Sequence, residues 1–188
     1  TADLGADTGG LRLRDDGRIE VDDHGRTSAT GVWALGDVSA PYQLKHVANA
    51  EARTIAHNLA HPDDLRRLPL EHVPSGVFSH PQIATVGLTE QECVEQGRAH
   101  VAYVQGYGDT AYGWAMEDTT SVCKLLASPE TGQLIGAHLM GEQASTLIQP
   151  LVQAMSFGQT AHDVARGQYW IHPALMEVVE NALLDALP

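Results

Sequence analysis

The chain has 188 residues, of which 43% are hydrophobic, and a formal net charge of −13 from 24 acidic and 11 basic side chains. This hydrophobic fraction is sufficient for a packed core and argues against a disordered protein. No cluster of Lys and Arg offers a surface for nucleic acid or an anionic membrane, and no apolar run is long enough to cross a bilayer. We therefore expect a soluble protein that binds neither nucleic acid nor membranes.

The chain starts at Thr1 with a loop-like stretch that holds no complete structural unit, which indicates a trimmed product or a fragment. Its two cysteines, Cys93 and Cys123, stand in unlike contexts and match neither a disulfide framework nor a metal knuckle. This pattern fits a reducing cytoplasm. No cysteine pair is spaced closely enough for redox chemistry.

Short strands separated by turns are expected in the first part of the chain. Alternation and apolar runs predict strands over residues 11–14, 18–22 and 31–35, with turns at 15–17 and 24–25. Apolar residues at helical spacing then predict a helix over residues 43–59. The members of this apolar face are Leu44, Val47, Ala48, Ala52 and Ile55. A break at residues 61–64 places a domain boundary between residues 70 and 71.

Strands and helices alternate after this boundary. Strands are expected over residues 76–79, 83–87, 103–107, 121–127 and 134–140, and helices over residues 144–157 and 173–187. Thr89 and Glu92 form a capping box at the start of a further helix. The turn at residues 129–132 predicts a hairpin between the last two strands.

His172 and Glu177 are the strongest candidates for acid–base chemistry. Pro173 biases His172 away from helical geometry, so its imidazole should project just outside the last helix. Glu177 is expected about one turn into that helix, and a carboxylate there can accept the Nδ1–H and favour the protonated ring. Glu180 is a rival partner, and the alternative is that both residues are only solvated helix-start residues.

Gly36 and Asp37 follow the apolar segment over residues 31–35. Ligands of α/β sheets gather at the carboxyl ends of strands, where an Asp can accept hydrogen bonds from ribityl or sugar hydroxyls. The helix starting near Leu44 could face an electron-rich ligand group with its N-terminal amides. A plain turn Asp is the simpler interpretation of Asp37 alone.

Two other features are weaker. His57 and His61 are four residues apart, which puts two imidazoles on one helix face, but no third ligand completes a zinc site. We therefore predict no metal. The aromatic and glycine residues at 107–114 could shape a pocket, but a loop between strands or a subunit contact explains them better.

Several segments together resemble the pyridine nucleotide-disulfide oxidoreductases. Residues 26–38 are similar to the second FAD-contacting stretch of that family, residues 44–48 to the helix start beneath the flavin, and residues 78–90 to the entry of its interface domain. Many relatives have Thr-Pro where this chain has Lys45-His46. Residues 107–120 and 167–173 resemble the mycothione reductase branch of the family.

The resemblance implies an α/β (α+β) fold. Residues 71–188 would form a dimerisation domain with a mixed, largely antiparallel sheet flanked by helices, and residues 1–70 a β-rich remnant of the NADPH- and FAD-binding domains. The FAD contacts would come from Gly36, Asp37, Leu44, Lys45 and His46. The His172–Pro173 bond is often cis in relatives.

The resemblance also implies a homodimer that reduces a small-molecule disulfide such as mycothione with FAD and NADPH. His172, oriented by Glu177, would protonate the departing thiol across the dimer interface. The redox cysteines would lie upstream, so the fragment should be inactive alone and should not hold FAD tightly. Two alternatives stay open: a stand-alone dimerisation module without catalysis, and part of a dihydrolipoamide dehydrogenase.

Overall fold

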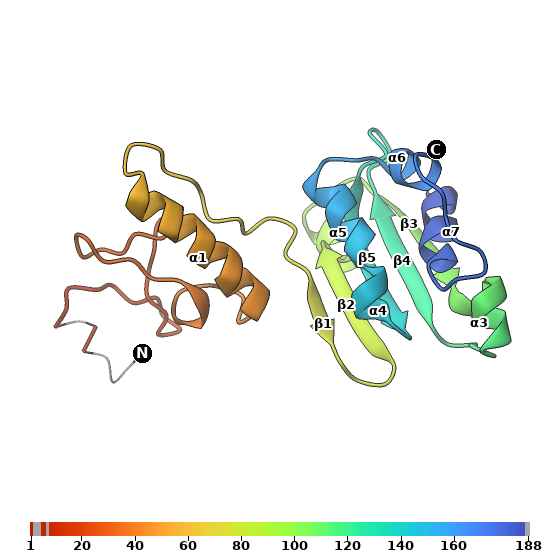
Figure 1. The fold of residues 1–188 in the computed structure, drawn as a ribbon, viewed down its shortest axis with the longest axis horizontal. Coiled ribbons are helices and arrows are strands. Elements are labelled where there is room, and N and C mark those ends of the chain that lie inside the picture. Colours follow the sequence, from red (N-terminus) through yellow and green to blue (C-terminus); the bar gives the residue numbers. More distant parts are fainter. Residues whose placement is uncertain (2–4, 7, 187–188) are drawn as a thin grey trace. The chain divides into compact units, whose positions relative to one another are not determined.

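The computed structural model describes residues 1, 5–6 and 8–186. The chain divides into two compact units, Thr1–Glu71 and His72–Pro188, both drawn in Figure 1. Among the residues described, no helix has the length and apolar character that a bilayer crossing requires.

The first unit consists of loops, the short 3-10 helix η2 (Gly36–Val38) and the helix α1 (Lys45–Ala60). Where strands are expected over residues 11–14, 18–22 and 31–35, the structure has only the isolated bridges Leu13–Ile19 and Arg26–Trp33. Tight turns connect the residues of each bridge: the N–H of Gly17 donates to the carbonyl of Arg14, and the N–H of Gly25 donates to that of Asp22.

Helix α1 confirms the helix expected over residues 43–59 and buries one face. Val47 and Ile55 lie on that face as expected, but Ala52 is exposed and the acidic Glu51 is buried instead. Asn58 is also buried. Its side chain accepts the N–H of Arg66 at 2.7 Å and donates to the Arg66 carbonyl at 2.9 Å, so it fixes the loop that follows α1.

The second unit is built on a five-stranded sheet with the order β1-β2-β5-β4-β3. Its strands are β1 (Ser75–Val77), β2 (Gln82–Gly87), β3 (Val101–Gly106), β4 (Val122–Ala127) and β5 (Leu134–Gly141). The expected α+β class and the β4–β5 hairpin are confirmed. All four pairings between these strands are antiparallel, so the sheet described is not mixed.

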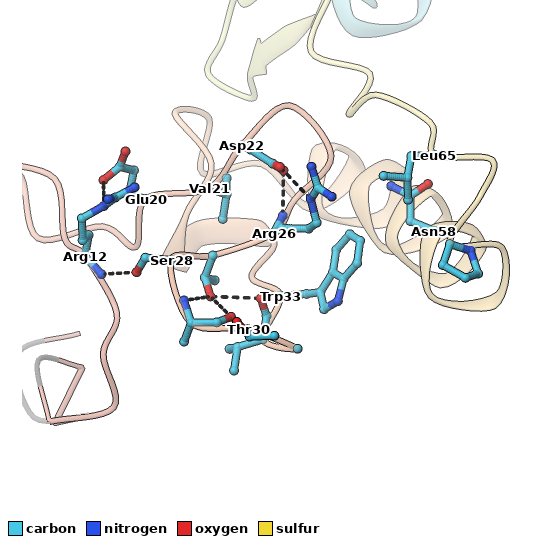
Figure 2. Close-up of a pocket in the computed structure, with 15 residues that line it drawn as sticks. Arg12, Glu20, Val21, Asp22, Arg26, Ser28, Thr30, Trp33, Asn58 and Leu65 are labelled. Carbon is cyan, nitrogen blue, oxygen red and sulfur yellow. Dashed lines mark hydrogen bonds and ion pairs between the residues drawn. The ribbon is translucent and has the colours of Figure 1, made fainter.

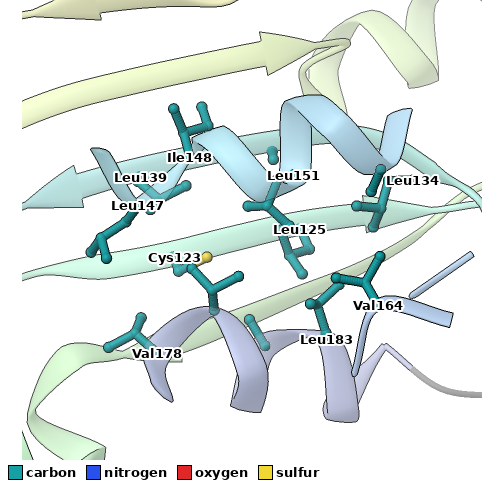
Figure 3. Packing of buried hydrophobic residues seen from close by; sticks show 14 of the residues in the cluster. Cys123, Leu125, Leu134, Leu139, Leu147, Ile148, Leu151, Val164, Val178 and Leu183 are labelled. Carbon is teal, nitrogen blue, oxygen red and sulfur yellow. The ribbon is translucent and has the colours of Figure 1, made fainter. Parts of the chain in front are cut away.

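Helices cover both faces of this sheet. The helix α2 (Glu90–Glu95) begins with the expected Thr89–Glu92 capping box and packs through Cys93 against Leu126 and Ile135. The other face carries the larger core, in which Cys123 and Leu125 pack with residues of the C-terminal helices (Figure 3). These helices are α4 (Ala144–Leu147), α5 (Gln149–Ser156), α6 (Ala161–Arg166) and α7 (Glu177–Asp185).

Two helix predictions need correction. The helix expected over residues 144–157 is divided into α4 and α5, because Pro150 has no N–H to donate to the carbonyl four residues earlier. The last helix begins at Glu177 and not at Pro173, and Leu187, its expected end, lies outside the described residues. The His80–Pro81 and His172–Pro173 peptide bonds are cis.

Two short helices after β3 were not expected, and neither was α6. The 3-10 helix η3 (Tyr107–Asp109) and the helix α3 (Ala111–Ala115) follow β3, where the sequence indicated a loop. The Thr110 hydroxyl accepts the N–H of Gly113 at 3.3 Å and donates to the Tyr107 carbonyl at 2.8 Å. These bonds fold the segment onto the buried Tyr107 at the end of the sheet.

Candidate functional site

His172 and Glu177 are in direct contact at the start of α7. A hydrogen bond of 2.7 Å joins the imidazole Nδ1 to the carboxylate Oε1 of Glu177. The His172 side chain is 69% exposed and that of Glu177 only 16%, so the carboxylate is covered while the ring remains accessible. Since Nδ1 is engaged by Glu177, Nε2 is the ring nitrogen available to a ligand.

The Glu177 carboxylate is held at both oxygens. Its Oε2 accepts the backbone N–H of Ala174 at 3.1 Å. The hydrogen bond with His172, and after it that from Ala174, lowers the pKa of Glu177 below its usual value, while partial burial opposes this shift. Glu180, the rival partner, makes no hydrogen bond or ion pair with His172 among the described residues, so the structure pairs His172 with Glu177.

Residues of the α3 segment lie beside His172. A cavity of about 530 Å³ is lined by residues 108–112, Trp114, Ala115, His172 and Pro173. The aromatic segment that sequence analysis considered as a possible pocket wall therefore shares a cavity with the candidate acid–base residue.

Gly36 and Asp37 begin η2 in the first unit. Gly36 has a φ of +69°, and its N–H donates to Oε2 of the buried Glu51 at 2.6 Å. Asp37 is exposed and has no hydrogen-bond partner among the described residues. A Cβ at Gly36 would lie 3.4 Å from the Cβ of Ala48, so η2 packs closely against the first turns of α1.

Leu44, Lys45 and His46 stand at the N-terminus of α1. Leu44 is the N-cap residue and makes no side-chain capping bond, while Lys45 and His46 are exposed. The structure therefore brings the five residues expected to contact a cofactor to one end of α1. Sequence analysis missed Glu51, although an acid on the apolar face of a helix was a visible signal.

His57 and His61 stack with ring centroids 4.5 Å apart. The Nε2 of His57 lies 2.9 Å from the carbonyl oxygen and 3.2 Å from the carboxylate of Asp64, and the Nδ1 of His61 lies 3.1 Å from the His57 carbonyl. No group of three or more metal-binding side chains occurs in the described part of the chain. These contacts connect the two imidazoles to the last turn of α1 and to the loop that follows it.

A second cavity, of about 620 Å³, lies in the first unit among residues of its loops and the end of α1 (Figure 2). Its charged side chains are paired with each other: Arg26 with Asp22 at 2.7 Å, and Arg12 with Glu20 at 3.0 Å. None of the site residues expected from sequence lines it.

The two cysteines cannot form a redox pair with each other. Cys123 lies in the core on one face of the sheet and Cys93 in the core on the other, and both are buried. Burial raises the pKa of the Cys123 thiol to about 12. An unreactive thiol is the expected result.

Two family models match the chain. The family model described as "Pyridine nucleotide-disulphide oxidoreductase, dimerisation domain" matches residues 73–183, and the model "Pyridine nucleotide-disulphide oxidoreductase" matches residues 1–53. The chain is 58% identical over 185 residues to mycothione reductase of Mycobacterium tuberculosis, and the matched region covers 96% of this chain and 40% of that protein. It is 35% identical over 181 residues to dihydrolipoyl dehydrogenase of Corynebacterium glutamicum, covering 95% of this chain and 38% of the relative.

Solved structures show the same fold. The crystal structure of LpdA from Mycobacterium tuberculosis superposes with a TM-score of 0.87 at 27% identity, covering 100% of this chain and 40% of that one. The chain thus spans about two fifths of the length of these relatives. Members of the family use FAD and NAD(P)H. The chain belongs to the pyridine nucleotide-disulphide oxidoreductases, and its residues 73–183 form the dimerisation domain of that family.

Proposed function

We propose that the chain is the C-terminal portion of an NADPH-dependent flavoprotein disulfide reductase that reduces mycothione in a reducing cytoplasm. The observation that carries this proposal is the 2.7 Å bond between His172 Nδ1 and Glu177 Oε1, which leaves an exposed imidazole with Nε2 free. The 58% identity to a mycothione reductase supports the choice of substrate.

The role of His172 is to move a proton. In the overall reaction one disulfide, one NADPH and one proton give two thiols and NADP⁺. A cysteine thiolate attacks one sulfur of the substrate, the sulfur–sulfur bond breaks, and the departing sulfur takes the proton from Nε2 of His172. Glu177 holds the ring and balances its charge in the protonated state. Positioned acid–base catalysis contributes roughly 10²–10⁴-fold to rate.

The residues at the start of α1 fit part of an FAD site. The Asp37 carboxylate is exposed and unpaired among the described residues, so it can accept hydrogen bonds from ribityl hydroxyls. The first-turn amides of α1 lack a side-chain cap at Leu44, and Lys45 and His46 stand exposed beside them. Gly36 sets the turn that presents Asp37. When bound, FAD relays two electrons between the nicotinamide and the cysteine pair.

The dithiol and most of the FAD contacts must come from outside these 188 residues. Cys93 and Cys123 are buried on opposite faces of the sheet and cannot supply the dithiol. We therefore propose that the fragment is inactive alone and that, in a homodimer, His172 serves the cysteine pair of the partner subunit. A dimerisation module without catalysis would not need the exposed Asp37 or the His172–Glu177 pair.

The full-length protein tests this proposal through its choice of substrate. We expect a flavin absorbance spectrum, and NADPH oxidation that depends on mycothione. A dihydrolipoyl dehydrogenase, which the 35% identity to such an enzyme makes the second candidate, would instead reduce NAD⁺ with dihydrolipoamide. Turnover with dihydrolipoamide and none with mycothione would reject the proposed substrate.

A further inference from the structure

The residues proposed to contact FAD lie on both sides of Ala40 in the sequence. Gly36 and Asp37 precede it and residues 44–46 follow it, so the position of Ala40 governs how these two groups are placed. Ala40 is 2% exposed, and its N–H donates to the carbonyl of Gly36 at 2.7 Å. This bond closes the turn, and the carbonyl of Ala40 needs a partner from another part of the chain.

The side chain of Arg18 supplies this partner. Its Nη1 donates a hydrogen bond to the carbonyl oxygen of Ala40. The Arg18 side chain is only 24% exposed, so this bond is partly shielded from water. A hydrogen bond from a charged donor is stronger than one between neutral groups. Arg18 therefore holds the end of the turn from a segment 22 residues earlier in the sequence.

Asp16 holds the guanidinium in the orientation that this bond requires. Its Oδ2 accepts the Nε–H of Arg18 at 2.8 Å and an Nη2–H at 2.5 Å, and its Oδ1 accepts the backbone N–H of Arg18 at 3.1 Å. These bonds occupy one edge of the guanidinium and leave Nη1 for Ala40. The hydrogen bond from the Arg18 side chain lowers the pKa of Asp16, so the carboxylate is charged at neutral pH. Asp16 therefore orients Arg18.

Two further hydrogen bonds hold the same turn. The N–H of Ile19 donates to the carbonyl of Val38 at 2.8 Å, and Glu51 of α1 accepts the N–H of Gly36 at 2.6 Å. The turn is thus held at its start by α1, in its middle by Ile19 and at its end by Arg18. The exposed carboxylate proposed to contact the ribityl chain lies between the first two of these bonds.

Two neighbouring arginines make no such contact. Arg12 pairs with Glu20 at 3.0 Å, and Arg26 pairs with Asp22 at 2.7 Å. Among the residues that the structure describes, neither of these side chains bonds to residues 36–46. The contact with the turn is therefore specific to Arg18 within this group of arginines.

We propose that Arg18 is a positioning residue of the FAD site. Through the carbonyl of Ala40, it fixes the turn that carries Asp37 relative to the start of α1. Its effect is on cofactor binding and not on the proton that His172 supplies. This inference rests on the proposed function, because it takes residues 36–37 and 44–46 as FAD contacts.

The test compares the rate of FAD release from full-length holoenzymes, followed by the fluorescence of free flavin after dilution. Arg18→Met keeps a long side chain and removes its donors, whereas Arg18→Lys keeps a charged donor. We expect release to be about tenfold faster in Arg18→Met and less than about threefold faster in Arg18→Lys. The recovery in Arg18→Lys distinguishes a hydrogen bond to Ala40 from simple packing of the side chain.

Arg12→Met is the matched control. Arg12 belongs to the same unit and forms an ion pair with Glu20, but its side chain makes no hydrogen bond with the turn. We expect its FAD release to equal that of the wild type. Circular dichroism of each variant checks that the fold is unchanged.

A second variant tests the orientation of the guanidinium without removing it. Asp16→Ala leaves Arg18 in place but free to rotate, so we expect FAD release to be faster than in the wild type. Because Asp16 acts through Arg18, the double variant Asp16→Ala/Arg18→Met should release FAD at the rate of Arg18→Met alone. Additive effects of the two substitutions would contradict the orienting role of Asp16.

Release at the wild-type rate in Arg18→Met would overturn the role of Arg18. Equally fast release from Arg12→Met would also overturn it, since the loss of any arginine would then loosen the unit. If Arg18→Met does not fold, Asp16→Ala decides, and release at the wild-type rate in that variant overturns the role. A full-length wild type that contains no FAD would reject the proposed function itself, whereas a normal FAD content with unaffected variants rejects only the positioning role.

Discussion

One carboxylate oxygen of Glu177 accepts a hydrogen bond of 2.7 Å from Nδ1 of His172, and the other accepts the backbone N–H of Ala174 at 3.1 Å. Because both oxygens accept hydrogen bonds, the carboxylate is held in one orientation. Its hydrogen bond with Nδ1 in turn fixes the orientation of the exposed imidazole. In the function that we propose, Glu177 fixes the orientation of the ring and balances its charge, and His172 exchanges the proton.

Glu177→Gln should weaken this arrangement without abolishing it. An amide has only one acceptor, so it cannot serve both His172 and Ala174, and a neutral hydrogen bond is weaker than one to a charged group by about 1 to 1.5 kcal/mol. We expect kcat to fall roughly tenfold, less than for removal of His172. Steady-state assays of the full-length enzyme measure this; a loss equal to that of His172→Gln would contradict it.

The same variant should show a pH dependence of stability. The pKa of Glu177 is lowered in the folded protein, chiefly by the hydrogen bond with His172. Its stabilising contribution is therefore present above the unfolded value of about 4.5 and is lost as the pH falls through the folded pKa. The difference in unfolding temperature between the wild type and Glu177→Gln should disappear in that acidic range.

Glu51 should position the turn at Gly36, which we propose contacts FAD. Glu51→Ala leaves the N–H of Gly36 unpaired and should cost about 1–3 kcal/mol, with loss of FAD from the purified full-length protein. Burial raises the pKa of Glu51, so the contribution of Glu51 to stability is fully present below the unfolded value of about 4.5 and is lost as the pH rises through the folded pKa.

Glu51→Gln is the matched control for this position. Its amide oxygen can still accept the Gly36 N–H, and it carries no charge to desolvate, so it should retain FAD and equal or exceed wild-type stability at pH 8 in thermal unfolding. FAD loss from Glu51→Gln equal to that from Glu51→Ala would contradict the role given to this hydrogen bond.

Local sequence patterns predicted the elements that neighbouring residues stabilise. The capping box at Thr89 and the turn signal between β4 and β5 depend on neighbouring residues, and the structure contains the capping box and the hairpin. Thr160 and Asp163 form a second capping box, the local signal for α6, which sequence analysis did not use. The helix α3 had a weaker signal, since its Gly113 is a poor helix former and is needed there for close approach to Tyr107.

The features that the sequence did not predict depend on contacts between residues that are distant in the sequence. The burial of Glu51 depends on the Gly36 amide, which is fifteen residues away in sequence. The start of α7 at Glu177, and not at Pro173, follows from a turn at residues 172–176 that buries Leu175. The spacing of His172 and Glu177 indicated a pair, but the choice between Glu177 and Glu180 needed the position of both carboxylates.

The most direct test of the central claim is the transient kinetics of His172→Gln in the full-length enzyme. Flavin reduction by NADPH and reoxidation of the reduced enzyme by mycothione are measured separately in a stopped-flow instrument. We predict that reduction by NADPH proceeds at the wild-type rate while reoxidation slows by about 10²–10⁴-fold, because only the second step needs the proton from His172. Wild-type reoxidation in His172→Gln would contradict the assignment of His172 as the acid–base residue.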